Sequence, residues 1–241
     1  MRAFWIAFIG AAALAAAAPA CGQSPDLAQR LERRAEAGSA EARYHLGMLY
    51  NNGIGVPQDP RRAFAHFRAA AEAGDPLGAY KLGCYYAGQF GGEAVAPDEV
   101  EAQRWKLVAA RAGYALAQND VAVFYLRREQ WTQALPWLEA AGRQGEAQAL
   151  YNLSAVYREG LGTVPSRPRA WAYFRLSQLA GRGELTASAA RALDETWTPM
   201  SEAERGEAQR FAATFVTRQT PLTRRAMEGL ERAERVANGA G

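Results

Sequence analysis

The chain has 241 residues, of which 49% are hydrophobic and 22% charged, and this composition excludes an intrinsically disordered protein. Its 28 basic and 25 acidic residues give a formal net charge of +3. Such a balance provides no general attraction to nucleic acid or to an anionic membrane surface, so we expect neither as a partner through charge alone.

The N-terminal segment is typical of a secretory signal. Arg2 is followed by an apolar run from Ala3 to Ala18 and then by small residues. The run is short for a helix that spans a membrane between two aqueous flanks. We therefore expect residues 1–20 to be a signal peptide and the mature protein to be exported to the periplasm.

The segment APAC, which ends at Cys21, resembles the acylation site of bacterial lipoproteins, although its alanine and proline depart from the usual pattern. The resemblance implies a lipid on Cys21, and Gly22 after it implies anchoring to the outer membrane. The alternative is ordinary signal-peptidase cleavage near Ala20 or Gly22. The other cysteine is Cys84, so either the two cysteines pair or Cys21 is lipidated and Cys84 is left alone.

A two-part pattern occurs four times in the middle of the chain. Its first part reads RYHLGMLY from Arg43, YKLGCYY from Tyr80, NDVAVFY from Asn119 and YNLSAVY from Tyr151. Its second part reads AFAHFRAAAEAG from Ala63, AQRWKLVAARAG from Ala102, ALPWLEAAGRQG from Ala134 and AWAYFRLSQLAG from Ala170. Apolar and small residues recur in both parts at helical spacing, so each copy predicts two helices joined by a turn.

The glycine-rich stretch NNGIGV in the first copy predicts a structural turn rather than a phosphate-binding loop. Similar turns, GQFGGEAV and EGLGTV, occur at the same place in the second and fourth copies. No strand precedes NNGIGV and no Gly-Lys-Ser/Thr follows it, so the context of a phosphate loop is missing. Asp59 and Pro60 are typical of a helix N-cap and first helical residue, which places the second helix directly after this turn.

These motifs resemble the Sel-one-like repeat, a relative of the tetratricopeptide repeat. The order A-x-x-Y-x-L-G-x-x-Y, G-x-G-V, D, A-x-x-W and A-A-x-x-G recurs between about Ala40 and Gly181. The resemblance implies an all-α fold, a right-handed α-solenoid of about four helix-turn-helix repeats with capping helices at both ends, which holds protein partners. The third copy departs from the family at Asn119 and at its turn, LRREQW. Pro136 in its second helix predicts a late start or a bend there.

The segments around the repeats are expected to cap them, because the end repeats of a solenoid have no neighbour to cover them. We expect a capping half-repeat at 25–39, four repeats within 40–183 (40–75, 76–114, 115–145 and 146–183), capping helices at 184–218, and a helical or disordered tail at 219–241. Ser201 and Glu204 predict a capping box. The mixed charges of the tail suggest a solvated surface.

No motif in the chain indicates catalysis. The sequence contains no H-E-x-x-H, G-x-S-x-G or S-x-x-K pattern, and its acidic residues are spread over helix surfaces. His45 and His66 occupy repeat positions that packing explains, and Cys84 is typical of a small apolar residue in a helix. We therefore expect no catalytic residue, no metal site and no cofactor.

The first helices of the repeats predict a binding groove. Each has a polar residue and, one turn along the same face, an apolar residue. The polar ladder is His45, Lys81, Asp120 and Asn152, and the apolar ladder is Leu49, Tyr85, Phe124 and Val156. We interpret the ladders as the edge and floor of a groove that binds a protein or peptide partner on the concave face of the solenoid. The alternative, that the apolar ladder is core between repeats, stays open.

Two functional classes follow. The first is a non-enzymatic protein-protein interaction scaffold of the bacterial cell envelope. The second is an envelope hydrolase or cell-wall protein of the penicillin-binding or β-lactamase kind, by analogy with a cysteine-rich branch of the same family. That branch joins each repeat with a disulfide, whereas Cys84 is the only cysteine within the repeats of this chain. The sequence therefore favours the scaffold.

Overall fold

The computed structural model describes residues 26–90, 92–180 and 185–239, and the regular elements in these stretches are all α-helices. They are α1 (Asp26–Glu36), α2 (Ala40–Asn52), α3 (Pro60–Glu72), α4 (Pro76–Tyr86), α5 (Glu99–Arg111), α6 (Ala115–Arg127), α7 (Trp131–Arg143), α8 (Ala147–Glu159), α9 (Arg167–Leu179), α10 (Ala187–Trp197), α11 (Glu202–Thr214) and α12 (Pro221–Ala237). The expected signal peptide, residues 1–20, and the candidate acylation site, Cys21, lie outside the described residues. None of these twelve helices has the length and apolar character needed to cross a membrane.

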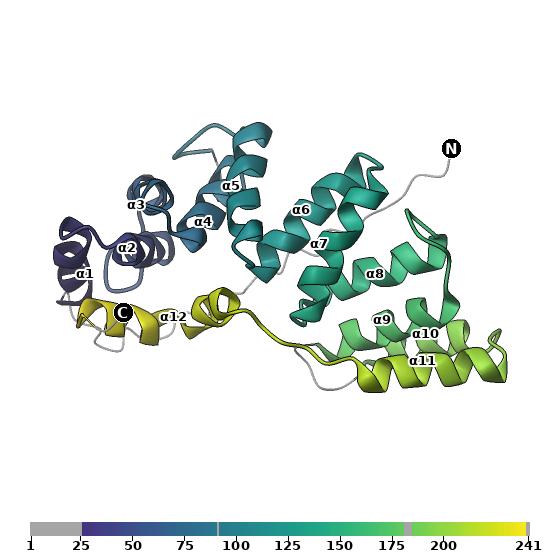
Figure 1. Cartoon of the computed structure of the whole chain (residues 1–241). Coiled ribbons are helices and arrows are strands. Elements are labelled where there is room, and N and C mark those ends of the chain that lie inside the picture. Colours follow the sequence, from purple (N-terminus) through teal and green to yellow (C-terminus); the bar gives the residue numbers. More distant parts are fainter. Residues whose placement is uncertain (1–25, 91, 181–184, 240–241) are drawn as a thin grey trace.

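Helices α2 to α9 form four consecutive helix pairs that stack in chain order (Figure 1). Within the pairs, α2 packs against α3, α4 against α5, α6 against α7 and α8 against α9. The second helix of each pair also packs against the first helix of the next pair. This arrangement is an α-solenoid, which confirms the all-α fold predicted from the repeated motifs.

Side-chain caps fix the starts of several helices. Asp59 precedes α3 and its carboxylate accepts hydrogen bonds from the backbone N–H groups of Arg61 and Arg62. Ahead of α11, Ser201 and Glu204 form the predicted capping box. These caps satisfy N–H groups that have no acceptor within the helix, so the boundaries follow from local sequence.

The turns inside the pairs need a residue in the left-handed backbone conformation. Gly53 ends α2 with φ 66° and Gly160 ends α8 with φ 71°. In the third pair the corresponding turn has no glycine, and Glu129 takes a φ of 57° instead. The departure of LRREQW from the family motif therefore leaves a strained residue at this turn.

Small residues of one helix receive large side chains of its partner. A Cβ added at Gly47 of α2 would lie 2.6 Å from Cδ1 of Phe67 of α3, so this glycine allows close packing. His66 of α3 stacks on Tyr50 of α2 with ring centroids 5.5 Å apart. The packing role expected for His66 is thus confirmed.

Polar contacts around Tyr50 repeat along the array. Its hydroxyl lies 3.4 Å from a carboxylate oxygen of Glu32 of α1 and 3.3 Å from Nη1 of Arg62 of α3. The same three residue types meet in the fourth pair, where they are Glu139, Tyr157 and Arg169. Because Glu139 belongs to α7, the second helix of its pair, α1 has the place of a second helix ahead of the first pair.

Helix α7 contains Pro136 in its interior and begins five residues before it, at Trp131. Of the two alternatives predicted at Pro136, the late start is therefore wrong, and the bend stays a prediction. Proline has no backbone N–H, so Pro136 cannot donate a hydrogen bond to the carbonyl of Thr132 in the first turn of the helix. The helix thus lacks one hydrogen bond near its N-terminus, and the rest of it forms normally.

The C-terminal part of the chain covers one end of the array and then returns to the other. Helices α10 and α11 both pack against α9. An extended segment, residues 215–220, follows α11, and α12 lies against α1 and α2 (yellow in Figure 1). The segment thus joins the last helices of the array to the first ones.

Candidate protein-binding surfaces

Three members of the apolar ladder are part of the core. Leu49, Tyr85 and Val156 are each at most 2% exposed, whereas Phe124 is partly exposed. The ring of Tyr85 packs between those of Phe67 and Phe90, with centroids 5.9 and 4.7 Å away. Neighbouring helices and the α4–α5 loop therefore cover the positions that we interpreted as the floor of an open groove.

Members of the polar ladder contact other residues of the chain. Asp120 Oδ2 lies 2.6 Å from Nζ of Lys106, and Asn152 donates a hydrogen bond of 3.2 Å to Asn119. Lys81 Nζ lies 5.7 Å from the ring centroid of Phe90, and burial lowers its pKa. Nε2 of His45 lies 3.8 Å from Oε1 of Glu41. The ladder is thus tied into the array, and partner binding at these four residues stays a prediction.

The surface of α6 and α8 near this ladder is partly open. Leu116, near the start of α6, is 42% exposed, and Tyr151 of α8 is 48% exposed. Tyr44 holds the same repeat position in α2 as Tyr151 does in α8, but it is only 7% exposed. We call the surface around Leu116 and Tyr151 the open face.

Cys84 lies in the core, and burial raises the pKa of its thiol. A thiol in that state is a poor nucleophile at neutral pH. Among the residues that the structure describes, no group of three or more His, Cys, Asp or Glu side chains could hold a metal ion.

A second surface, which the sequence analysis missed, is occupied by the C-terminal residues 215–239, here called the strap. The strap follows the turns that connect one helix pair to the next, and we call these turns the turn row. From the C-terminal to the N-terminal pair, the contacts are Thr217 with Gly145, Thr220 with Gly113, Arg225 with Asp75, Arg232 with Glu41, and Asn238 with Arg30. The strap therefore runs antiparallel to the order of the repeats and meets them one after another.

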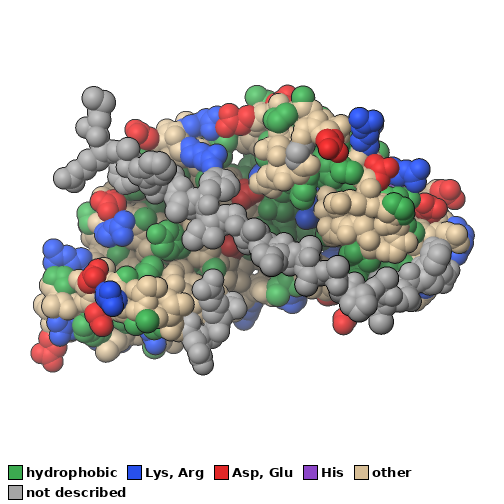
Figure 2. All heavy atoms as spheres, turned by 180° about the vertical axis from the view of Figure 1, so that it is seen from behind, with side chains coloured by type: hydrophobic (Ala, Val, Ile, Leu, Met, Phe, Trp, Pro, Cys, Tyr) green, Lys and Arg blue, Asp and Glu red, His purple; other side chains and the backbone are tan. Residues whose placement is uncertain are grey.

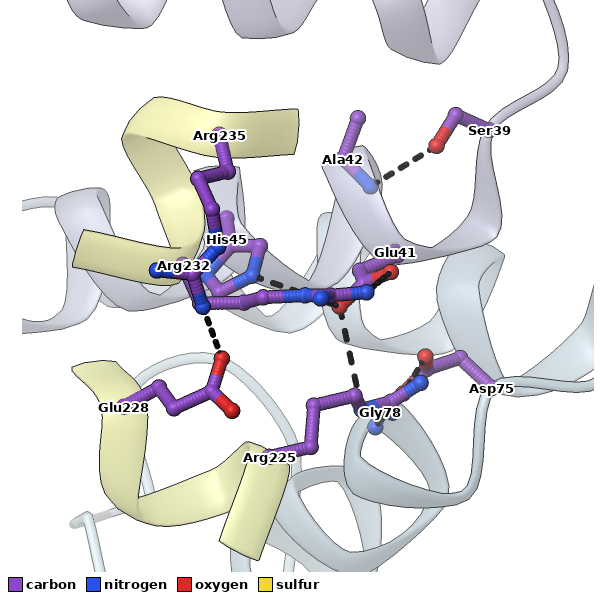
Figure 3. Close-up of polar contacts among 10 residues, drawn as sticks. All are labelled: Ser39, Glu41, Ala42, His45, Asp75, Gly78, Arg225, Glu228, Arg232 and Arg235. Atoms are coloured by element: carbon purple, nitrogen blue, oxygen red, sulfur yellow. Dashed lines mark hydrogen bonds and ion pairs between the residues drawn. The ribbon is translucent and has the colours of Figure 1, made fainter. Parts of the chain in front are cut away.

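Two carboxylates hold α12 to the turn row (Figure 3). Arg232 donates from Nε and Nη2 to the two carboxylate oxygens of Glu41, at 2.9 and 3.2 Å. Arg225 donates from Nη2 to Oδ2 of Asp75 at 2.7 Å. Oδ1 of Asp75 accepts the backbone N–H of Gly78 and caps α4, so this carboxylate is fixed before the arginine binds. We call Glu41 and Asp75 the acidic pair.

Charges at this contact change the ionisation of nearby groups. Burial raises the pKa of Glu41, but contact with His45, hydrogen bonds from Arg232 and the positive charge of Arg225 outweigh it and lower the pKa to about 2. Burial, together with the charge of Asp75, raises the pKa of Tyr44 to about 12. Glu41 is therefore ionised and Tyr44 is neutral at any pH near 7.

Hydroxyl groups hold the start of the strap. Thr220 Oγ1 donates to the carbonyl oxygen of Gly113 at 2.9 Å, and Thr223 Oγ1 donates to Oε1 of Gln144 at 2.7 Å. Thr223 Oγ1 also accepts the backbone N–H of Ala115 at the start of α6, at 3.1 Å. Because these polar groups are partly or fully buried, each contact satisfies a donor or acceptor that would otherwise be left unpaired.

The tail was expected to be helical or disordered with a solvated, charged surface, and the structure corrects the second part of that interpretation. Two of its arginines, Arg225 and Arg232, pair with carboxylates of the array. They are seven residues apart, and apolar residues around them recur at spacings of four, at Leu222, Ala226 and Leu230. That amphipathic pattern was the signal that could have predicted a docked helix.

The remaining surface charges are mixed in sign. On the face shown in Figure 2, Lys and Arg side chains are interspersed with Asp and Glu side chains. The distribution agrees with the near-balance of the composition and provides no single-sign patch on that face.

The chain matches a known repeat family. The Sel1 repeat matches residues 40–75, 76–114 and 147–181. The matched residues comprise the first, second and fourth helix pairs and leave out the third, the copy that departs most from the motif.

The chain is also similar to a bacterial protein. An uncharacterized protein of Neisseria meningitidis serogroup B is 33% identical over an alignment of 178 residues, and the match covers 69% of this chain and 35% of the relative. The chain thus spans about a third of the length of the curated relative that it matches.

Two solved structures are similar in fold. A Sel1 repeat protein from Oxalobacter formigenes is 25% identical with a TM-score of 0.59, and the match covers 78% of each chain. A protective antigen present in uropathogenic Escherichia coli strains, which displays an SLR fold, is 20% identical with a TM-score of 0.49, over 86% of this chain and 50% of the antigen.

Proposed function

Because the chain is a Sel1-repeat protein, we propose that it is a non-enzymatic scaffold of the bacterial cell envelope that binds a protein or peptide partner on the open face. Helical repeat arrays offer extended surfaces, and their binding residues lie on helices that neighbouring repeats hold rigid. The scaffold class is what this family supports, while the partner and the envelope location are parts of the proposal.

The observation that carries the proposal is the exposure of two large side chains on the first helices of adjacent pairs. Leu116 and Tyr151 are both more than 40% exposed, whereas Tyr44, beside the strap, is nearly buried. Tyrosine is enriched at protein interfaces, and the exposed leucine adds apolar area to the same surface. Asp120 lies one turn after Leu116 in α6, and Asn152 directly follows Tyr151 in α8. Both would supply polar contacts at the edge of the open face.

The experiment is cross-linking and capture from envelope fractions, followed by titration with the purified partner. A Leu116→Glu, Tyr151→Glu variant puts charges on the open face. Its matched control is Val100→Glu, Val108→Glu, which makes the same change at two exposed apolar residues of α5. Circular dichroism and thermal melts verify that both variants fold.

We expect the wild type and the α5 control to capture the same partner, and the open-face variant to bind it at least tenfold more weakly, about 1.4 kcal/mol. If all three proteins bind the partner equally, the open face is not its binding site. If no protein is enriched over a mock capture by any of the three, the scaffold proposal fails.

Export and lipidation belong to the same proposal. The support is the N-terminal sequence, where Arg2 precedes an apolar run that ends near Cys21. Intact mass spectrometry of the protein from envelope fractions would give the mature N-terminus. A mass increase of a diacylglyceryl and an acyl group that disappears in Cys21→Ala would support the anchor, whereas an unmodified N-terminus near Ala20 or Gly22 would support release into the periplasm.

A further inference from the structure

The strap is held by ion pairs and hydrogen bonds together with a small apolar contact. Of the residues of α12, only Thr223, Ala233, Val236 and Ala237 are buried. Gly229, with φ 55° and ψ −123°, interrupts the helix, so Arg225 and Arg232 lie on two separate short halves. The strap begins with an extended segment of six residues, 215–220, which joins α12 to α11. Such an element can leave its site without unfolding the repeats.

The site beneath the strap selects for arginine. Glu41 receives two donors of one guanidinium, from Nε and Nη2 of Arg232, a fork that lysine does not have. Asp75 receives Arg225 while its other oxygen caps α4. The acidic pair therefore offers two fixed carboxylates on adjacent repeats, placed for arginines seven residues apart.

The same site also receives apolar side chains. Leu222, Ala226 and Leu230 are partly buried against the core formed by the first repeats. Leu222 and Ala226 lie on one face of the first half of α12, and Leu230 follows the break at Gly229, so each half presents an apolar side chain to the core. A ligand of this site is thus an amphipathic helix with a similar break, which carries one arginine on each half and turns apolar side chains towards the array.

We propose that the turn row between α1 and α6 is a recognition site for an arginine-bearing amphipathic helix of a second protein, and that the strap is its resident occupant. This site is distinct from the open face of α6 and α8, so the inference holds or fails independently of the scaffold function proposed there. The partner helix carries two arginines seven residues apart and replaces the bonds of Arg225 and Arg232.

Competition between strap and partner follows from the tether. Because only six residues join α12 to α11, α12 has an effective concentration in the millimolar range at its site. A free segment of the same sequence therefore competes only at a similar concentration. The concentration of partner needed to displace the strap falls if the partner binds the site more tightly or if the strap binds it more weakly. It falls by the same factor as the ratio of the two affinities changes.

The test uses the full mature chain and a fluorescent synthetic peptide of residues 216–239, followed by fluorescence anisotropy. The loosened chain carries Arg225→Ala and Arg232→Ala, which weaken the strap and leave the site intact. Its matched control carries Arg224→Ala and Arg235→Ala. These two arginines contact Gln219 and Glu228, within the strap itself.

We expect the loosened chain to bind the peptide with one-to-one stoichiometry at a concentration at least tenfold lower than the control chain does. A peptide that carries Arg225→Ala and Arg232→Ala should not bind. A peptide with Arg232→Glu should bind only when the loosened chain also carries Glu41→Arg, because that pair of substitutions exchanges the charges. Equal binding to the loosened and control chains, or none to either, would overturn the proposal.

Light scattering distinguishes another occupant. If the loosened or the wild-type chain forms dimers by exchanging straps and the peptide does not dissociate them, the site serves a second copy of this chain and the proposal is wrong.

Hydrogen exchange tests displacement of the strap in the wild-type chain, without any substitution. With millimolar peptide, the amides of α12 should exchange faster while those of α4 stay protected, and unchanged exchange of α12 would count against displacement.

Discussion

The close approach of α2 and α3 at Gly47 makes a direct prediction about stability. Changing Gly47 to alanine adds one methyl group, which would lie 2.6 Å from two ring atoms of Phe67. Phe67 is fully buried, and its ring contacts those of Tyr44 and Tyr85, with centroids 6.2 and 5.9 Å away. The ring therefore has little room to move, and we expect Gly47→Ala to destabilise the protein.

The magnitude follows from two opposing effects. Overpacking a rigid core costs about 1 to 3 kcal/mol, and the fixed ring of Phe67 places this site near the upper end. Alanine in place of glycine within a helix returns about 1 kcal/mol. The net loss is then about 2 kcal/mol, which corresponds to a fall in melting temperature of about 4 to 8 °C for a chain of this size.

The assay is unfolding by urea and by heat, followed by circular dichroism at the helix signal. The matched control is Gly206→Ala in α11, where an added Cβ would meet only the end of the flexible Arg210 side chain, at 3.1 Å. We expect that variant to gain stability, by up to about 1 kcal/mol. Phe67→Leu should offset part of the loss in Gly47→Ala, because it removes the ring atoms that clash. If Gly47→Ala is as stable as the wild type, the packing argument is refuted.

Other elements give smaller effects. Asp59→Ala removes the cap of α3 and should lower the free energy of unfolding by about 1 kcal/mol in urea titrations. Glu129→Gly relieves a positive φ and should raise it by up to about 1 kcal/mol in the same titrations. The pKa of Glu41 is lowered to about 2. The ionised carboxylate therefore adds its full share to the free energy of unfolding above pH 4.5, and this share is lost as the pH falls towards 2. With allowance for solvent screening, Glu41→Gln should cost about 1 to 2 kcal/mol at pH 6 and almost nothing at pH 2.

The repeated helix pairs were predictable because their signals are local. Gly47, with tyrosines three residues to either side, recurs as a pattern, and Asp59 before Pro60 marks the start of a helix within a few residues. Each of these signals acts through neighbours on the same or the adjoining helix, so no distant contact is needed to read it. The sequence therefore predicted the solenoid and the places of its turns.

The floor of the predicted groove was harder to assign because periodicity shows that a face is apolar but not what covers it. Tyr85 is covered by Phe64 and Phe67 of α3 and by Phe90 of the following loop. Phe90 lies outside the repeat motif, in a turn whose length differs between copies. The helical positions alone therefore could not predict that the ring of Phe90 covers Tyr85.

The strap was missed for a different reason, which is sequence separation. Arg225 meets Asp75 across 150 residues, and Arg232 meets Glu41 across 191 residues. In the tail the arginines look like ordinary surface charges, because their partners become neighbours only after the repeats have stacked. Asp75 likewise looks like a helix cap and nothing more, since that local role already accounts for its presence.

The acidic pair and the open face differ in chemistry and lie on different repeats, which makes them separable. The open face presents Leu116 and Tyr151, whereas the turn row presents the carboxylates of Glu41 and Asp75 beneath an arginine-bearing helix. Substitutions at sites without shared contacts usually have additive effects. Loosening the strap with Arg225→Ala and Arg232→Ala should therefore leave binding at the open face unchanged, and Tyr151→Glu should leave peptide binding at the turn row unchanged. If either change alters binding at the other surface, the strap and the open face belong to one coupled site, and a partner at one would control access to the other.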